Sequence, residues 1–272
     1  MVFISIFLAQ AFLKTALYGI STYYTVYFLE SFGSDVFIWL WIIWMVGASV
    51  ITPVYVDLVL PSLEEYAQLQ SGSLKDKIER LAAEVGFPFS HIYITRGNNQ
   101  SDEDHIAYFA GLFSSKAIII SASLVLFLTE EEIVAVVAHE MGHWKLGHSW
   151  YYLVSRAIYS FCICFFLRNY YDNGAVYEAF QINPSNAGMS FLLVTSYLYP
   201  PLERLLNIYL RSVTRRCEFQ ADRFAKNHGF MNHLKSALRK MYEQKKIFPV
   251  ADPWYSICYY SHPSILERVQ AL

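Results

Sequence analysis

The sequence predicts a mainly α-helical, polytopic membrane protein that also carries an α+β domain on the cytosolic side. Of its 272 residues, 55% are hydrophobic and 17% aromatic, and the mean hydropathy is +0.27. Only 16% are charged, against roughly 25% in a typical soluble domain. The charged residues form blocks separated by long uncharged runs, which is typical of membrane spans that alternate with aqueous segments. The net charge of -2 and the lack of a basic stripe exclude nucleic acid as an expected partner.

Four stretches approach the roughly 20 apolar residues that a helix needs to cross the hydrocarbon core of a bilayer. They are Met1–Leu29, Val36–Val56, Trp150–Leu167 and Ala187 to about Tyr209. Val36–Val56 carries no charged residue and is rich in Trp, Ile and Val. The other three each contain charge, namely Lys14 in the first, Arg156 in the third, and Glu203 with Arg204 in the fourth. We therefore expect four spans.

The spans divide the chain into four segments. Residues 1–60 hold two transmembrane helices, 61–148 an aqueous segment, 149–210 a transmembrane hairpin and 211–272 a second aqueous segment. Most Lys and Arg residues lie in the aqueous segments, whereas the loops 30–35 and 168–181 carry one basic residue between them. The positive-inside rule therefore places both aqueous segments in the cytosol. The four cysteines show no metal-type or disulfide-type spacing.

Local patterns predict the elements of the first aqueous segment. Ser73–Val85 has helical spacing, Ser90–Thr95 and Ala107–Ser121 have the composition of short strands, and Asn98–Asp104 is a polar loop. Thr129, followed three residues later by Glu132, forms a capping box. A helix should begin there and continue through the apolar residues 133–137.

This helix carries the sequence H-E-x-x-H. His139 and His143 are separated by four residues, so they share one face of the helix and both imidazoles can reach one ion. Glu140 lies beside them, where its carboxylate can reach a water molecule instead of the metal. The pattern is that of the zinc metalloproteases, with the glutamate as general base.

A third ligand is needed to complete the site. His148 has the wrong spacing to supply it, and we interpret it as a helix-end or interfacial residue. Glu218 on a later helix can be the ligand, and Asp222, one turn further, can accept a hydrogen bond from a ligand imidazole. Two membrane crossings between His143 and Glu218 return the chain to the same side. We expect one zinc ion per chain, near the cytosolic membrane surface.

Beyond the metal ligands, five segments in order resemble the type 1 CAAX prenyl proteases, which are integral-membrane gluzincin metalloendopeptidases of the endoplasmic reticulum and inner nuclear membrane. They are Ala107–Gly111, Ala138–His148, Arg215–Asp222, Phe248–Asp252 and Tyr260–Arg268. The resemblance implies a gluzincin-like α+β metalloprotease domain. It also implies removal of the C-terminal tripeptide from a prenylated C-a-a-X protein at a lipid bilayer.

The resemblance assigns further residues. It matches His139, His143 and Glu218 to the family's zinc ligands, Glu140 to its catalytic glutamate and Asp222 to the carboxylate behind the ligands. It implies that His262 donates a hydrogen bond to the developing oxyanion. The substrate-binding residues that it implies are Ala107, Tyr108, Phe109 and Gly111, on an edge strand that pairs with the substrate, together with Arg216 and Arg268.

The sequence departs from the family in two places. Asp104-His105-Ile106 stands where the family has His-Ser-Asn before the edge strand. Four spans are expected instead of the family's seven, and the others would precede Met1, as in a fragment or a reduced member. Two alternatives stay open, namely a quality-control metalloprotease of membrane proteins and a non-catalytic relative that acts as a membrane scaffold. The Phe-Pro-Val and Ser-His-Pro segments favour the prenyl protease over the first, and the complete set of catalytic side chains argues against the second.

Overall fold

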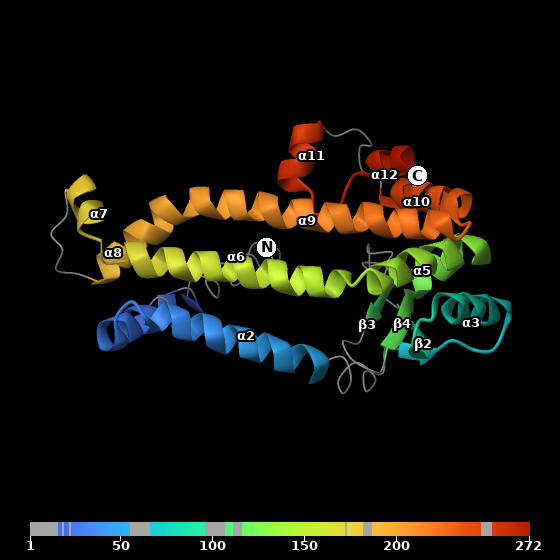
Figure 1. Cartoon of the computed structure of the whole chain (residues 1–272), viewed down its shortest axis with the longest axis horizontal. Coiled ribbons are helices and arrows are strands. Elements are labelled where there is room, and N and C mark those ends of the chain that lie inside the picture. The colour runs from blue at the N-terminus through green and yellow to red at the C-terminus, as the bar shows by residue number, and fades with distance from the viewer. Residues whose placement is uncertain are drawn as a thin grey trace, which may run out of the picture. The chain divides into compact units, whose positions relative to one another are not determined.

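The computed structural model describes residues 16–17, 19–21, 23–54, 66–95, 107–110, 116–171, 173–181, 187–245 and 252–272. The chain divides into two compact units. Unit 1 comprises residues 1–46 and 157–206, and unit 2 comprises residues 47–156 and 207–272. Two long helices that Figure 1 shows, α6 and α9, each contribute residues to both units.

In its described part, unit 1 consists of helices joined by turns. It contains described residues between 16 and 32, the first half of α2 (Val36–Val54), the second half of α6 (His148–Tyr170), α7 (Gly174–Ala179), α8 (Ala187–Leu193) and the start of α9 (Tyr199–Asn227). Leu29, Val36, Phe37 and Tyr171 form a small core, against which Cys164 and Leu167 of α6 and Phe191 of α8 pack. On α2, the indole N–H of Trp41 donates to Ser160 Oγ at 3.1 Å, which ties α2 to α6.

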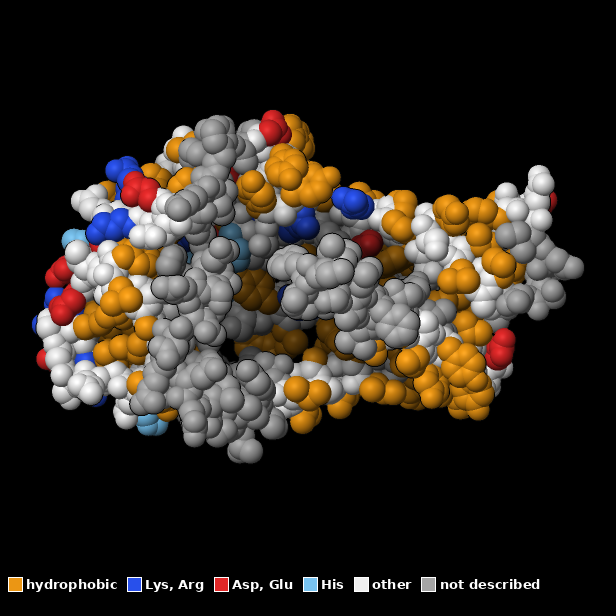
Figure 2. Space-filling model, turned by 180° about the vertical axis from the view of Figure 1, so that it is seen from behind, with side chains coloured by type: hydrophobic (Ala, Val, Ile, Leu, Met, Phe, Trp, Pro, Cys, Tyr) orange, Lys and Arg blue, Asp and Glu red, His pale blue; other side chains and the backbone are white. Residues whose placement is uncertain are grey.

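Among the described residues, α6 is the one helix long and apolar enough to cross a membrane by length and composition. It contains the expected span Trp150–Leu167, and only 6% of its apolar window is buried. The second expected span is represented by the shorter apolar helix Val36–Ile51, and most of the first lies outside the described residues. On the face in Figure 2, hydrophobic side chains gather over the helices of unit 1, and charged ones over the part with the sheet.

The fourth expected span is helical but changes its helix type. The five residues Val194–Leu198 form a π-helical turn, η3, between α8 and α9. Pro200 and Pro201 follow in the first turn of α9. Because proline has no backbone N–H and its ring clashes with the preceding turn, regular α-helical bonding is interrupted here. By residue 216, α9 carries three further arginines besides Glu203 and Arg204, and it is not among the described helices that are long and apolar enough to cross a membrane.

Unit 2 contains a four-stranded sheet with the order β1-β2-β4-β3. Its strands are β1 (Tyr66–Gln68), β2 (Phe89–Thr95), β3 (Ala107–Ala110) and β4 (Lys116–Ser121). The central pair β2 and β4 is parallel, and the two outer pairs are antiparallel. The strands expected within 90–95 and 107–121 are confirmed. Strand β3 pairs with β4 alone among the described strands, so it is an edge strand, with Ala107 opposite Ile120.

Helix α5 (Glu130–Lys145) is the centre of unit 2. It contacts α3 (Ser73–Val85), α4 (Ala122–Phe127), α10 (Met231–Lys245) and β3. Most of its residues from 132 to 143 are buried, because neighbours cover it on several sides. The core joins residues of these helices and the sheet, including Ile78, Ile118, Ile133, Val137 and Leu238. Helix α3 has the predicted bounds. Two short helices, α11 (Pro253–Tyr259) and α12 (Ile265–Ala271), complete the unit.

The predicted capping box begins α5. Thr129 Oγ1 accepts from the Glu132 N–H at 3.3 Å, and Glu132 Oε2 accepts from the Thr129 N–H at 2.8 Å. Glu132 is 4% exposed and also accepts from Ser236 at 2.6 Å and Lys240 at 2.8 Å, both on α10. Burial opposes its charge, but these hydrogen bonds outweigh burial and hold the pKa of Glu132 below its ordinary value. The cap thus fixes both the start of α5 and its position against α10.

Candidate metal centre and active site

Helix α5 presents its two motif histidines on one buried face. His139 is 5% exposed and His143 is 9% exposed, and their Nε2 atoms are 3.1 Å apart. The i, i+4 spacing therefore brings the imidazoles together as the sequence predicts. Glu140, between them in the chain, lines the same cavity.

Helix α9 brings a buried carboxylate to the histidines. Glu218 Oε2 is 3.6 Å from His139 Nε2, and Glu218 Oε1 is 3.5 Å from His143 Nε2. The three ligand atoms lie within 4.8 Å of one another, so one metal ion can reach all of them. The predicted ligand set is thus assembled from two helices, and its members His143 and Glu218 are 75 residues apart in the chain.

A glycine in the motif permits the two ligand helices to approach closely. A Cβ atom added to Gly142 on α5 would lie 3.0 Å from Cβ of Phe224 on α9 and 3.1 Å from two of its ring carbons. Such a separation is shorter than van der Waals contact. A larger residue at position 142 would therefore require Phe224 or the α9 backbone to shift by a few tenths of an ångström.

Asp222 and Arg268 support the ligands from behind. His139 Nδ1 lies 2.9 Å from Asp222 Oδ1, so Asp222 is placed where it can accept the hydrogen bond that the sequence predicts. Arg268, on α12, donates to both oxygens of Asp222, at 2.6 and 2.8 Å, and its Nη1 is 3.4 Å from Glu218 Oε2. The guanidinium thus compensates two buried carboxylates, each of which costs free energy when its charge is unpaired.

His148 is the residue that sequence reasoning missed. It is the first residue of α6, as expected for a helix-end residue, yet it is fully buried and its Nδ1 is 2.9 Å from His143 Nδ1. Gly147, with a φ of 69°, separates α5 from α6. This left-handed conformation, which glycine adopts readily, lets the chain turn so that His148 meets His143. In the sequence, Gly147 between the H-E-x-x-H helix and His148 was the feature that could have indicated a turn bringing His148 back to the motif.

Burial shifts the acid–base properties of the cluster. It raises the pKa of Glu140 to about 7, and the negative charge of Glu218 adds to the effect. At Glu218, burial opposes the charge, but hydrogen bonds from His139 and His262 outweigh it and hold the pKa well below the ordinary value. Glu218 is therefore ionised, as a metal ligand must be, whereas Glu140 has a pKa near neutrality, as a general base requires.

A cavity of about 930 Å³ opens from the metal ligands. Glu140, His262, Arg268 and Ala107 of strand β3 all line it. His262 is 63% exposed, and its Nδ1 lies 3.2 Å from Glu218 Oε1. The structure thus brings the expected oxyanion donor, one arginine and the start of the edge strand to one cavity.

The other expected substrate-binding residues are Arg216, Tyr108, Phe109 and Gly111. Arg216 is exposed and is not among the residues that line the cavity, whereas its neighbour Arg215 is buried and bonds Ser256 and Glu267. Successive residues of a helix point about 100° apart, so α9 turns the Glu218 face inward and Arg216 outward. Tyr108 and Phe109 belong to β3, and Gly111 lies outside the described residues.

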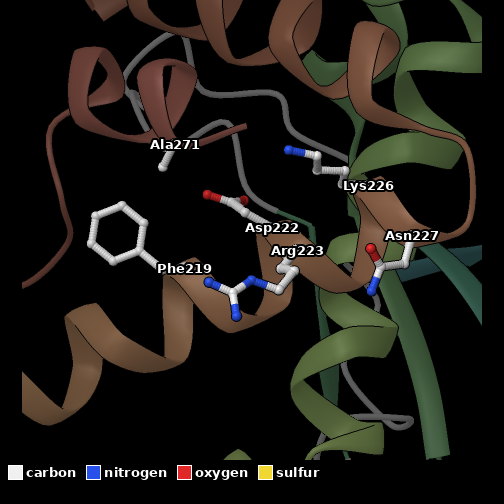
Figure 3. A pocket seen from close by; sticks show the side chains of 6 residues that line it. All are labelled: Phe219, Asp222, Arg223, Lys226, Asn227 and Ala271. Atoms are coloured by element: carbon white, nitrogen blue, oxygen red, sulfur yellow. The ribbon is translucent and has the colours of Figure 1, made fainter.

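A second cavity, of about 510 Å³, lies beside Asp222 (Figure 3). Phe219, Arg223, Lys226 and Asn227 of α9 line it together with Asp222, and Ala271 of α12 closes it. It contains none of the metal ligands and no Glu140. The larger cavity is therefore the candidate active site.

Two histidines one helical turn apart, a glutamate from a later helix and a free glutamate between the histidines define a metallopeptidase site. The comparison with known families agrees, because residues 68–272 match peptidase family M48, to which the chain belongs.

Several members of this family are similar to the chain over most of its length. The CAAX prenyl protease 1 homolog of Oryza sativa subsp. japonica is 34% identical over 249 residues, covering 90% of this chain and 57% of the relative. The Homo sapiens homolog is 30% identical, with 90% and 60% covered. The crystal structure of S. mikatae Ste24p matches with a TM-score of 0.78 and 28% identity, covering 99% of this chain and 66% of that one. The chain thus spans less than two thirds of each.

Proposed function

We propose that the chain is a zinc-dependent membrane endopeptidase that removes the C-terminal tripeptide from prenylated C-a-a-X proteins. One observation carries the proposal, namely that a single cavity is lined by the three metal ligands, the free carboxylate of Glu140 and the start of an edge strand. The similar proteins are named CAAX prenyl proteases. The proposed location is the endoplasmic reticulum membrane, with several spans and with the catalytic unit in the cytosol.

The donor set and its spacing support zinc as the metal. Two imidazole nitrogens and one carboxylate oxygen are the ligands of many catalytic zinc sites, and zinc–ligand bonds of roughly 2.0–2.1 Å in a tetrahedron place neighbouring ligand atoms roughly 3.3 Å apart. The two histidine Nε2 atoms are 3.1 Å apart, and Glu218 faces them with different oxygens, Oε1 at 3.5 Å from His143 Nε2 and Oε2 at 3.6 Å from His139 Nε2. His139, His143 and Glu218 would hold the ion, which would polarise the scissile carbonyl and acidify the attacking water.

The remaining chemistry belongs to side chains. Glu140 accepts the proton of the attacking water and passes it to the leaving amine, a transfer that its pKa of about 7 favours. His262, exposed to the cavity, donates a hydrogen bond to the developing oxyanion. Asp222 and Arg268 hold the His139 ring in place throughout.

The edge strand and the bilayer position the substrate. Among the described strands, β3 pairs on one side only, and an extended peptide can add as a further strand on the other side. The apolar side chains of Leu210 and Val213 line the cavity and suit the aliphatic residues of a C-a-a-X sequence. A prenyl chain anchors its protein to the membrane, which concentrates the substrate where α6 enters the bilayer.

Turnover of a defined peptide tests the proposal. The detergent-purified chain, loaded with one equivalent of zinc, should release the C-terminal tripeptide from a farnesylated C-a-a-X peptide, as detected by mass spectrometry. Glu140→Gln protein prepared in parallel should release none. Cleavage at scattered positions in unprenylated, unfolded polypeptides would support the quality-control alternative instead. A zinc-loaded chain that cleaves neither substrate would overturn the proposal.

A further inference from the structure

Two further side chains, His148 and Gln220, lie behind the candidate metal ligand His143. His148 is 0% exposed, and both of its ring nitrogens have a partner. Its Nδ1 lies 2.9 Å from His143 Nδ1, and its Nε2 lies 3.0 Å from Gln220 Oε1. Gln220 is on α9, two residues beyond the ligand Glu218. The three side chains therefore link α5, the start of α6 and α9 in one row of hydrogen bonds.

The positions of the protons in this row follow from the position of the metal ligands. His143 Nε2 is the nitrogen that faces Glu218 and His139, so it is the atom available to a metal. A histidine that binds through Nε2 carries its proton on Nδ1. His148 Nδ1 must then accept that proton in a hydrogen bond, which leaves the proton of His148 on Nε2. The Gln220 amide oxygen is an acceptor at the correct end to receive it.

We propose that His148 and Gln220 are positioning residues for the metal site, which fix the ring orientation and the tautomer of His143. The inference rests on the proposed function only in that a metal binds at His143. Donor and acceptor alternate through all three side chains, and no other tautomer of His148 satisfies both of its contacts. These hydrogen bonds hold the His143 ring in its metal-binding orientation before the metal binds.

The two ligand histidines are supported by partners of different charge. His139 has the carboxylate of Asp222, which in turn requires the cation Arg268. His143 has a neutral partner, because His148 accepts with one nitrogen and donates with the other. A second carboxylate at the buried position of His148 would need its own counter-ion to offset its desolvation. The neutral pair of His148 and Gln220 supplies the same directional bond without one.

Metal retention in the full-length purified chain tests this role directly. His148→Phe and Gln220→Leu each break the row at a different bond, and each should weaken zinc binding by about 10- to 100-fold in competition with a chelator. His148→Asn should restore most of the affinity, because its side-chain oxygen can accept near the position of Nδ1. The matched control is His228→Asn, since His228 also bonds through Nδ1 but to a backbone carbonyl of α9, at Phe224. It should bind zinc like the wild type.

Two further measurements separate positioning from a purely structural role. The thermal unfolding midpoint of the metal-free chain should change little in Gln220→Leu, whereas the visible spectrum of the cobalt-substituted site should shift. Unchanged zinc affinity in both Gln220→Leu and His148→Phe would overturn the inference, as would a loss in stability of the metal-free chain that accounts for the whole effect. If His148→Phe does not fold, Gln220→Leu decides alone. A wild-type chain that binds no zinc would contradict the proposed function instead.

Discussion

His139 and His143 both direct Nε2 toward the proposed metal position, but their surroundings shift the pKa values of the two rings in opposite directions. At His139, burial and Arg268 disfavour the charge, but the hydrogen bonds of Asp222 and Glu218 outweigh them and raise its pKa to about 9. At His143, burial and then the charge of His139 lower the pKa to about 3. In the metal-free protein at neutral pH, the His139 ring is therefore the charged imidazolium and the His143 ring is neutral. A metal that binds at neutral pH displaces a proton from His139.

Different roles at the site predict different losses on mutation. Glu218→Gln and His139→Ala should each lower the zinc content of the purified chain, because each removes a ligand atom. Glu140→Gln should retain about one zinc per chain and lose proteolysis, because Glu140 handles protons and not the metal. Metal analysis beside a peptide-cleavage assay measures both properties. Normal zinc in Glu218→Gln with loss of zinc in Glu140→Gln would show that the two roles are reversed.

At the scale of secondary-structure elements, the site depends on how closely α5 and α9 pack. Gly142→Ala would place a methyl group 3.0 Å from Phe224 Cβ, which belongs to the α9 segment that also carries Glu218. The helices must separate or shift to accommodate it. We expect a loss of about 1–3 kcal/mol in the free energy of unfolding, together with weaker zinc binding.

A second glycine of unit 2 gives the matched control for this substitution. A Cβ added to Gly72, directly before α3, meets no atom within 4 Å. Gly72→Ala should therefore leave zinc affinity at the wild-type value, and thermal unfolding with a chelator titration compares the two variants. Wild-type zinc affinity in Gly142→Ala would mean that α9 can move without displacing Glu218.

The capping residue of α5 gives the chain a defined response to acid. The pKa of Glu132 is lower in the folded protein than its unfolded value of roughly 4.3, so its ionisation stabilises the fold above that pH and ceases to do so as the pH falls through the folded pKa. Glu132→Gln keeps a capping side chain but removes the charge. It should cost about 1.5–3 kcal/mol at pH 7, the range for hydrogen bonds to charged groups.

The pH dependence of this cost is what identifies the charge as its source. Unfolding midpoints of the wild type and Glu132→Gln should differ at pH 7 and converge as the pH falls below the unfolded pKa of roughly 4.3 and through the lower pKa of the folded protein, where the wild-type carboxylate becomes protonated. A difference that stays constant from pH 7 to pH 3 would assign the loss to the shape of the side chain.

Elements with a local signal could be predicted from the sequence, and contacts that depend on helix rotation could not. The periodicity of α3, the cap of α5 and the spacing of His139 and His143 are all properties of adjacent residues, and the structure agrees with them. Strand β1 has three residues and no alternating pattern. The contact of His148 with His143 arises at a glycine turn, and the turning of Arg216 away from the cavity depends on the rotation of α9.

At the scale of the whole molecule, α6 is the element that would connect the site with the membrane in the proposed topology. Its first residue, His148, contacts a metal ligand, and its apolar side chains further along, such as Val154, Ile158 and Phe165, are exposed. Near the site, α6 and α9 run antiparallel, because His148 bonds Gln220 and Ser155 Oγ lies 3.5 Å from Tyr209 Oη. The proposed hairpin of residues 149–210 would therefore leave and return on the side of the metal.

The side of the membrane on which the metal lies stays a prediction, and glycosylation can test it. Asn99-Gln-Ser101 is a glycosylation sequon within the segment 61–148, which we expect in the cytosol. The luminal glycosylation machinery cannot reach a cytosolic asparagine, so the chain expressed in eukaryotic cells should show no endoglycosidase-sensitive shift in gel mobility. A flexible linker that carries a sequon, inserted after Gln181 in the opposite loop, should acquire one. A glycan on the wild-type chain that disappears in Asn99→Gln, with none on the linker, would place the active site in the lumen and invert the proposed topology.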